Sequence, residues 1–293
     1  MQDKISRILL LMPYFGKWPF WMPLFLKSCE YNPDIDWLLI GDCGEPEGLP
    51  PNVKYKACTF SEYCEYASSR LGLEFRPDHP YKICDLRPAF GLIHQDETEG
   101  YEFWGFGDLD LVYGDLRAYF SEEKLNRFDF FSNHARRVSG HLCLIRNTEK
   151  LRTLFWNIPD FERRIQDKKH HALDEGGFSR LFIKRKNFPK PLFNLVGWFN
   201  PLRRAAQFKE AFSTPNGKIA WLDGTHEFPE HWVWDRGDLS NTKMLGATFP
   251  YFHFLIWKTT FRDDPELTSD SYIRALAQEG KWKIDSQGFH RLT

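Results

Sequence analysis

The chain has almost no net charge, since 39 Lys and Arg residues balance 40 Asp and Glu residues for a formal net charge of -1 at pH 7. Such a balance gives the whole molecule no long-range attraction for polyanions such as nucleic acids. None of the six cysteines occurs in CxxC spacing, which argues against a zinc knuckle or a thioredoxin-like motif. Cysteines scattered in this way are typical of reduced thiols in a cytosolic protein.

Long apolar runs are also missing from the sequence. None approaches the roughly 18 residues that a membrane-spanning helix needs. The run Ile8–Met12 follows Lys4 and Arg7 and faintly resembles a signal peptide, but it ends at Pro13 and no small-residue cleavage site follows. It predicts a buried first strand instead. We therefore expect a cytoplasmic protein, with at most peripheral contact at the inner face of a membrane.

Two acids after a central strand are the main chemical signal. The apolar stretch Tyr101–Phe106 predicts a strand that delivers Asp108 and Asp110, two residues apart. Side chains at i and i+2 point the same way in extended backbone, and two carboxylates there repel each other unless a cation lies between them. A divalent ion with hard oxygen ligands suits the pair, and diphosphates are its usual further ligands. The alternative is that both acids merely end a strand and cap the next element.

The two strands expected earlier in the chain end at residues that suit a nucleotide. Pro13 and Tyr14 follow the first apolar run, at a place where a nucleotide base can bind. Asp42 follows the second run, Trp37–Gly41, where acids in nucleotide-binding folds accept the ribose hydroxyls. Each of these residues also fits an ordinary turn.

A group of charged residues precedes the central strand. The segment Tyr81–Gln95 has helical periodicity that Pro88 interrupts, and Lys82, Asp85 and Arg87 lie just before that proline. The three side chains would be able to hold a sugar hydroxyl and a phosphate of a donor. Alternatively, they form a surface ion pair, which contributes little to stability.

Two further regions offer polar groups. Asp174 and Glu175 precede two glycines and an apolar helix, and they either cap that helix or project into a site as a base or sugar ligand. His253 lies in an aromatic stretch, and Lys258 follows five residues later. A histidine in such a strand is more often part of the core. A metal ligand and a phosphate-binding cation close together would, however, complete a diphosphate site begun by the paired acids.

The segment 180–204 contains seven Lys or Arg residues and no acid, interleaved with Phe, Leu and Trp. This basic, aromatic composition suits the interface of an anionic membrane, and the alternative is an irregular loop packed on the domain. Residues 261–293 are expected to form a polar tail with one short helix, from Ser269 to Gln278. The main domain is expected to span residues 1–260, with 180–204 as a basic aromatic insertion.

In this order and spacing, the motifs resemble those of GT-A-fold glycosyltransferases. Asp108-Leu109-Asp110 after an apolar strand resembles their DxD motif. His253 with Lys258 resembles the C-terminal His-x-x-x-x-x-Lys element of the glycogenin and lipooligosaccharide galactosyltransferase group, although the spacing is one residue shorter here. Asp85 and Arg87 resemble an Asp-x-x-Arg that precedes the DxD in capsular and mannosyl-type transferases, again one residue short. The stretch 107–115 also resembles a poorly characterised group of bacterial glycosyltransferase-like proteins.

The resemblance implies a Rossmann-type mixed α/β sheet flanked by helices, and a nucleotide-sugar donor whose diphosphate is bridged by Mn²⁺ or Mg²⁺. Asp108, Asp110 and His253 would bind the metal, and Lys258 would meet the diphosphate. UDP is the default nucleotide of the donor, and transfer with retention of the sugar's anomeric configuration is slightly favoured. The expected acceptor is a surface polysaccharide or a lipid-linked saccharide.

Two other classes of protein remain open on the sequence alone. A haloacid-dehalogenase-type phosphatase would use Asp108 as its nucleophile, since Asp-x-Asp-x-Val also fits residues 108–112. Against it, that motif normally opens the fold, and here about a hundred residues precede it. The second alternative is a catalytically inactive carbohydrate-binding protein that kept the fold.

Overall fold

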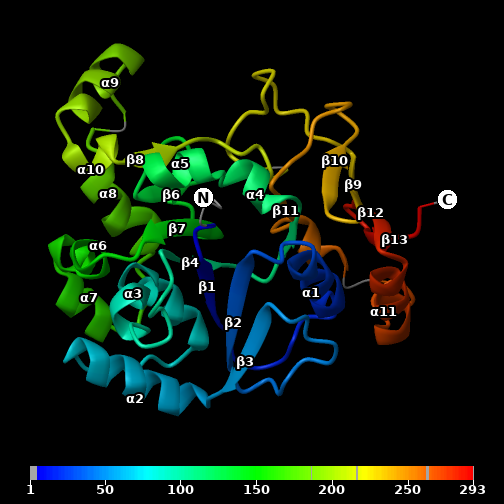
Figure 1. Ribbon diagram of the computed structural model, residues 1–293, viewed down its shortest axis with the longest axis horizontal. Coiled ribbons are helices and arrows are strands. Elements are labelled where there is room, and N and C mark those ends of the chain that lie inside the picture. Colours follow the sequence, from blue (N-terminus) through cyan, green and yellow to red (C-terminus); the bar gives the residue numbers. More distant parts are fainter. Residues whose placement is uncertain (1–4, 186, 216, 262–263, 293) are drawn as a thin grey trace.

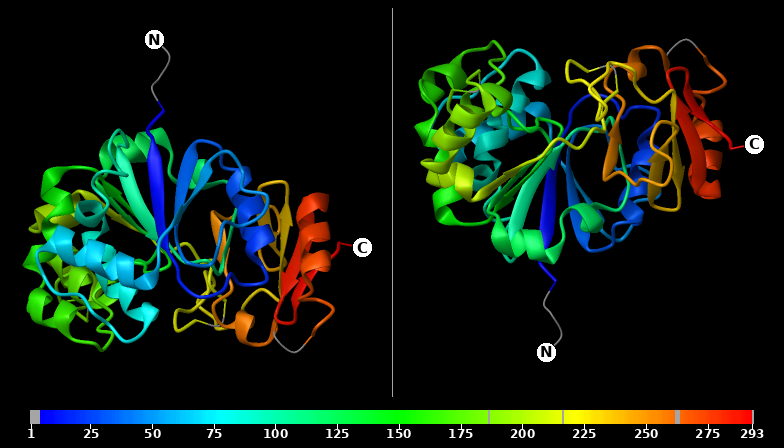
Figure 2. Two further views of the ribbon diagram at one scale, coloured as in Figure 1. Left: turned by 90° about the horizontal axis from the view of Figure 1, so that it is seen from below. Right: turned by 90° about the horizontal axis from the view of Figure 1, so that it is seen from above.

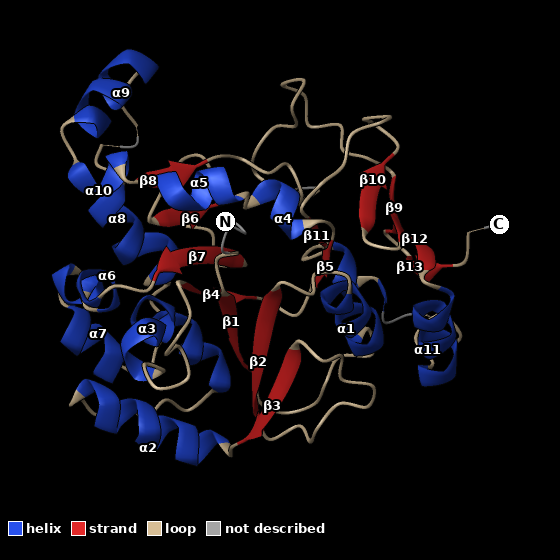
Figure 3. Cartoon of the chain, in the orientation of Figure 1, coloured by secondary structure: helices blue, strands red, loops and turns tan. Residues whose placement is uncertain are grey.

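The computed structural model describes residues 5–185, 187–215, 217–261 and 264–292. Its centre is a seven-stranded sheet in the order β3-β2-β1-β4-β7-β6-β8 (Figures 1 and 3). β1 to β4 run parallel, whereas β7 is antiparallel to both β4 and β6. The mixed α/β sheet expected from the sequence is therefore confirmed. The strands are β1 (Ile8–Pro13), β2 (Ile35–Gly41), β3 (Val53–Ala57), β4 (Phe103–Gly107), β6 (Phe130–Ser132), β7 (Leu142–Arg146) and β8 (Ala206–Phe208).

Helices cover both faces of this sheet, which explains why its central strands are continuously apolar (Figure 2). Successive side chains of β1 enter two different cores, with Leu9 and Leu11 on one face and Leu10 and Met12 on the other. The first core is closed by α2 (Phe60–Leu71), α3 (Phe90–Ile93), α6 (Glu149–Arg152), α7 (Phe161–Gln166) and α8 (Ser179–Phe182). The second core is closed by α1 (Met22–Glu30), α4 (Leu116–Tyr119) and α5 (Glu122–Arg127).

A second, antiparallel sheet of four strands forms the far side of the molecule. Its order is β10-β9-β12-β13, with strands β9 (His231–Asp235), β10 (Asp238–Asn241), β12 (Lys281–Asp285) and β13 (Gly288–His290). Its core is rich in tryptophan, and the rings of Trp234 and Trp282 stack with their centroids 4.0 Å apart. The helix expected near residue 269 is α11 (Asp270–Glu279). The segment 261–293 is more than the expected tail, because β12 and β13 complete this sheet.

Shorter elements connect these layers. They are the 3₁₀ segments η1 (Pro80–Ala89), η2 (Leu154–Asn157) and η4 (Trp257–Thr259), the π-helical turn η3 (Asp174–Phe178), the helices α9 (Lys190–Trp198) and α10 (Pro201–Arg204), and the strand pair β5 (Leu111–Tyr113) and β11 (Tyr251–His253). Within the described part of the chain, no helix is both long and apolar enough to cross a bilayer.

Candidate metal and diphosphate site

The pairing of β5 with β11 brings the two acids and His253 together. The chain turns at residues 108–110 after β4 and resumes as β5, which pairs antiparallel with β11 so that Leu111 lies opposite His253. The backbone N–H of Phe254 also donates to the carbonyl of Asp110 at 3.2 Å. Side chains about 145 residues apart in sequence therefore lie side by side: one ligating atom each of Asp108, Asp110 and His253 falls within 4.8 Å of the others.

The environment of His253 fits a metal ligand. The ring is 4% exposed, and its Nε2 is buried without a hydrogen-bond partner, 3.6 Å from Asp110 Oδ2. Its Nδ1 lies 3.1 Å from the Thr214 hydroxyl. With Nδ1 bonded to the Thr214 hydroxyl, Nε2 is the ring nitrogen that faces the two carboxylates, and it would offer its lone pair to a cation bound between them. Such a partner on the second ring nitrogen is a common way to orient a metal-binding histidine.

Two cations already face the two acids. Lys258 Nζ lies 2.7 Å from Asp110 Oδ2, and the Arg87 guanidinium forms an ion pair with Asp108. Burial by itself raises the pKa of Asp110, but His253 and Lys258 outweigh that effect and hold the pKa below its ordinary value. Asp110 is therefore ionised at neutral pH, as a carboxylate ligand of a divalent cation must be.

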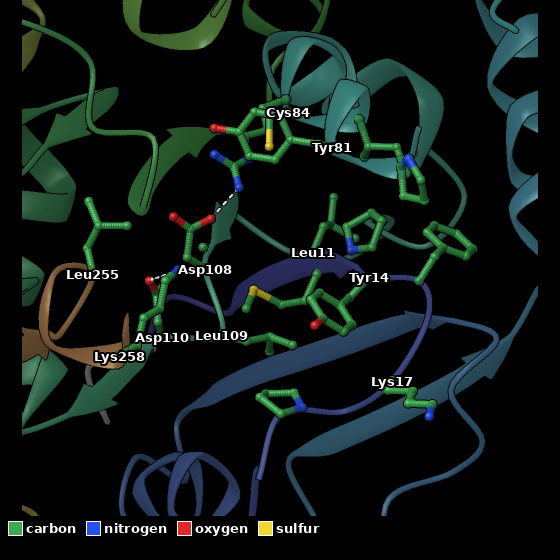
Figure 4. Close-up of a pocket in the computed structure, with 18 of the residues that line it drawn as sticks. Leu11, Tyr14, Lys17, Tyr81, Cys84, Asp108, Leu109, Asp110, Leu255 and Lys258 are labelled. Atoms are coloured by element: carbon green, nitrogen blue, oxygen red, sulfur yellow. Dashed lines mark hydrogen bonds and ion pairs between the residues drawn. The ribbon is translucent and has the colours of Figure 1, made fainter. Parts of the chain in front are cut away.

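A cleft of about 610 Å³ opens beside these groups (Figure 4). Asp108, Asp110 and Lys258 line one end of the cleft, and Pro13 and Tyr14 from the end of β1 also line it. Tyr14 is supported from behind by Trp18, with ring centroids 5.5 Å apart and an interplanar angle of 12°. The cleft thus combines acids and cations with an aromatic face, the set of groups that a nucleoside diphosphate with its metal would require.

Asp42 lies near this cleft but does not line it. Its side chain is exposed, and its Oδ1 accepts a hydrogen bond of 2.8 Å from the backbone N–H of Gly16. The bond holds the loop that carries Tyr14. Gly41 is needed at the same place, because a Cβ there would lie 1.9 Å from the carbonyl oxygen of Tyr14. Asp42 thus supports the loop through one oxygen, where a ribose contact was expected.

Lys82 and Asp85 are also placed differently from the expectation. Both are buried, at 2% and 0% exposure, and their charged atoms lie 2.9 Å apart. Lys82 Nζ donates to the carbonyl of Lys169, and Asp85 accepts from the backbone N–H groups of His171 and Leu173 at 2.8 Å. Neither side chain reaches the cleft. The structure gives them a positioning role in place of the expected donor contact, since they fix the loop that precedes η3.

Asp174 and Glu175 lie at the start of η3, close to Arg87. Arg87 Nη1 is 3.1 Å from Asp174 Oδ2, while its other terminal nitrogen meets Asp108, so one guanidinium connects η3 to the DxD turn. Glu175 pairs with Arg137 at 2.6 Å. Burial raises the pKa of Asp174, and Arg87 opposes this rise. Gly140 lies next to both acids, because a Cβ added to this glycine would be 3.1 Å from Asp174 Oδ2 and 3.2 Å from Glu175 Oε1. Both acids belong to a π-helical turn, and turns of this kind often occur at functional sites.

Several residues around the site were not predicted from the sequence. His141 stacks on the His253 ring at 4.2 Å between centroids, and its Nε2 is 2.7 Å from the Tyr251 hydroxyl. Burial and the neighbouring His253 lower the pKa of His141, which keeps this ring neutral. Thr214, which bonds to His253, and Trp18, which stacks on Tyr14, were also not predicted. The position of His141 follows from the pairing of β4 with β7. Next to this pairing, the backbone N–H of Asp108 donates to the carbonyl of His141, so the two residues lie side by side.

Comparison with known proteins gives one family match. The profile of a family described as being of unknown function, DUF6625, matches residues 10–279. No curated protein matches the sequence.

Three of the solved structures similar to this one are of glycosyltransferases. Mouse xyloside xylosyltransferase 1 in its apo form has a TM-score of 0.48 and 11% identity, over 86% of this chain and 98% of that chain. The galactosyltransferase LgtC, in complex with donor and acceptor sugar analogs, has a TM-score of 0.45 and 12% identity, over 94% and 96%. An active-site mutant of LgtC gives the same TM-score at 10% identity. At TM-scores below 0.5, these similarities assign neither a donor nor a reaction to this chain.

Proposed function

The chain belongs to DUF6625, a family of unknown function, and we propose that it is a metal-dependent glycosyltransferase that uses a nucleotide-sugar donor. The observation that carries the proposal is the orphaned Nε2 of His253, which faces two carboxylates beside an aromatic cleft. Asp108, Asp110 and His253 would hold Mn²⁺ or Mg²⁺. Oxygen and imidazole ligands suit these ions. The two carboxylates balance the two charges of the ion, and its remaining coordination positions are open to the oxygens of a diphosphate.

The residues of the cleft suit the departure of a nucleoside diphosphate. A bound divalent ion would supply Lewis-acid stabilisation of the charge that develops on that leaving group. Lys258, held at the same place by Asp110, would add a second positive charge on the diphosphate. Tyr14, backed by Trp18, offers a flat face for the base. UDP remains the default nucleotide, because it is the commonest partner of this metal arrangement in the families that the sequence resembles.

Asp174 and Glu175 are the candidates for contact with the sugars. Asp174 is buried and fixed by Arg87, so it suits a ligand that orients the donor sugar beside the DxD turn. Glu175 is partly exposed and meets Arg137, so it is the one of the two that an incoming acceptor hydroxyl would be able to approach. A retaining reaction needs no base there, whereas an inverting one would use Glu175 as general base. We favour retention, with a surface polysaccharide or a lipid-linked saccharide as acceptor.

A thermal-shift panel tests the proposal. Unfolding of the purified protein would be followed with UDP, GDP, CMP and ADP, each with and without Mn²⁺. We expect stabilisation by one nucleoside diphosphate that needs Mn²⁺ and is lost in Asp110→Asn. The matched control is Asp96→Asn, which removes an exposed carboxylate whose partner Arg70 is 3.4 Å away and outside the site.

The outcomes separate the three classes of protein. Stabilisation by a nucleotide that is independent of metal, without turnover, would indicate an inactive binding protein. No stabilisation by any nucleotide would contradict the proposal. Formation of a phospho-aspartate at Asp108 with phosphate esters would then assign the site to a phosphatase.

A further inference from the structure

Helix α9 carries an apolar face that the described part of the chain does not cover. Leu192 and Leu195 are 49% and 55% exposed, and Trp198 and Phe199 at the end of the helix are 66% and 76% exposed. Their spacing of three to four residues places them along one side of the helix. Figure 1 shows that α9 projects from the edge of the main body beyond α10, at the opposite end of the molecule from the second sheet.

The base of α9 is firmly attached, so its orientation is set by the fold. The buried side chain of Asn200 donates to the carbonyls of Leu181 and Phe182 at 2.9 and 3.0 Å. On the inner side of the helix, Phe193 packs against the main core, and the Arg136 guanidinium lies 5.4 Å from its ring centroid. The helix therefore presents its outer face while its inner face is packed.

Basic residues flank α9 in the sequence. The segment 180–204 contributes seven Lys or Arg residues and no acid, in a chain whose net charge is -1. Lys184, Arg185 and Arg204 are exposed, and Arg204 lies over the Trp198 ring at 5.4 Å from its centroid. Lys186 of the same run lies outside the described residues. Exposed Trp, Phe and Leu flanked by basic side chains are typical of helices that lie in the interface of anionic bilayers.

We propose that α9 is a docking element that inserts Leu192, Leu195, Trp198 and Phe199 into the interface of an anionic lipid membrane. The basic residues around it contact the lipid phosphates, each strengthening binding roughly fivefold at low ionic strength. A lipid surface fits better than a second protein, because the exposed face combines apolar side chains with charge of a single sign. The inference is independent of the metal site and goes beyond the proposed transferase activity.

Vesicle flotation tests this docking element with the intact protein. The probes are vesicles of phosphatidylcholine alone and of phosphatidylcholine with phosphatidylglycerol. We expect wild type to float with the anionic vesicles, less so in high salt, and only weakly with the neutral ones. The double variant Trp198→Ser with Phe199→Ser is expected to lose at least about tenfold in binding, because two large apolar side chains no longer leave water.

Two control variants keep the test specific. Leu245→Ser removes an apolar side chain that is 90% exposed in the loop after β10, and it is expected to float like wild type. Trp198→Phe retains an aromatic ring and is expected to retain most of the binding. Because these side chains are exposed, all variants are expected to unfold at the wild-type temperature.

The results decide the inference independently of catalysis. Asp110→Asn is expected to float normally even though it loses nucleotide binding. Equal flotation of wild type and the double variant would overturn the inference. So would a self-association in solution that the double variant abolishes, without any binding of wild type to vesicles, since a second copy of the chain would then cover the face.

Discussion

Replacing Lys258 with Met separates the two tasks that we assign to this lysine. Lys258 Nζ lies 2.7 Å from Asp110 Oδ2 and also lines the cleft, so it neutralises a metal ligand when the site is empty and would meet the diphosphate when it is full. Met keeps an unbranched side chain that is one atom shorter and removes the charge together with the hydrogen-bond donor. We expect the variant to bind Mn²⁺ alone at least as well as wild type, because Asp110 no longer has a competing cation.

Nucleotide binding is expected to respond in the opposite direction. A hydrogen bond to a charged group contributes about 1.5–3 kcal/mol. Lys258 is about one-third exposed, which weakens its field and favours the lower part of that range. Since 1.4 kcal/mol corresponds to a factor of ten, the affinity for UDP in saturating Mn²⁺ should fall roughly tenfold, and at most about a hundredfold.

Isothermal titration with Mn²⁺ alone, and then with UDP in saturating Mn²⁺, measures both effects. Lys243→Met is the matched control, because Lys243 makes an ion pair of the same 2.7 Å length with Asp223 away from the cleft. Unchanged UDP affinity in Lys258→Met would refute the reasoning, since the lysine would then be only a structural partner of Asp110. A parallel loss of Mn²⁺ affinity would show that the variant disturbs the metal ligands themselves.

Three further changes test other parts of the account. His253→Ala should weaken Mn²⁺ binding at least about tenfold while the protein stays folded, and an unfolded variant that still binds Mn²⁺ by titration would make His253 a core residue. Asp85→Asn leaves the buried Lys82 without its charged partner and should cost about 3–5 kcal/mol in the free energy of unfolding measured with denaturant; an unchanged midpoint would show that the pair does not hold the loop. Glu97→Gln should destabilise the protein at neutral pH. Burial raises the pKa of Glu97. The His94 ring 3.7 Å away and the 2.6 Å hydrogen bond from Lys56 more than offset this and hold the pKa below its ordinary 4.5, so its contribution is present above pH 4.5 and lost as the pH falls below it. A difference from wild type that persists in acid would contradict this linkage.

Local patterns were enough to predict the parts of the fold that decide the site. The apolar runs of β1 and β2 identify buried strands whatever they pair with. The spacing of Asp108 and Asp110 predicted that the two acids lie together, and they do so in the turn between β4 and β5. His253 was a candidate because Lys258 follows it, and β5 and β11 bring the histidine to the acids.

Other features depend on contacts between distant segments and were not predictable. The expected helix from Tyr81 to Gln95 is a 3₁₀ segment, Pro80–Ala89, which accommodates Pro88 and is followed by one α-helical turn, Phe90–Ile93. Lys82 and Asp85 look like exposed charges in the sequence, but the loop at residues 169–173 covers them and supplies their hydrogen bonds. Burial of this kind follows from tertiary packing and leaves no local pattern.

The C-terminal strands illustrate the same limit. β12 has only two apolar residues in alternation, Trp282 and Ile284, within an otherwise charged segment. They become a core only because Trp232 and Trp234 of β9 face them across the sheet. A short alternating pattern in a polar segment is easily taken for a tail, and its partner strand lies about 50 residues away.

The most direct test of the central claim is the anomalous diffraction of Mn²⁺ in crystals of the protein grown with UDP. The account predicts one strong manganese peak in contact with the carboxylates of Asp108 and Asp110 and with Nε2 of His253, bridged to the diphosphate of UDP in the cleft. UDP bound in the cleft without manganese, or manganese bound elsewhere while these three side chains keep their present partners, would contradict it.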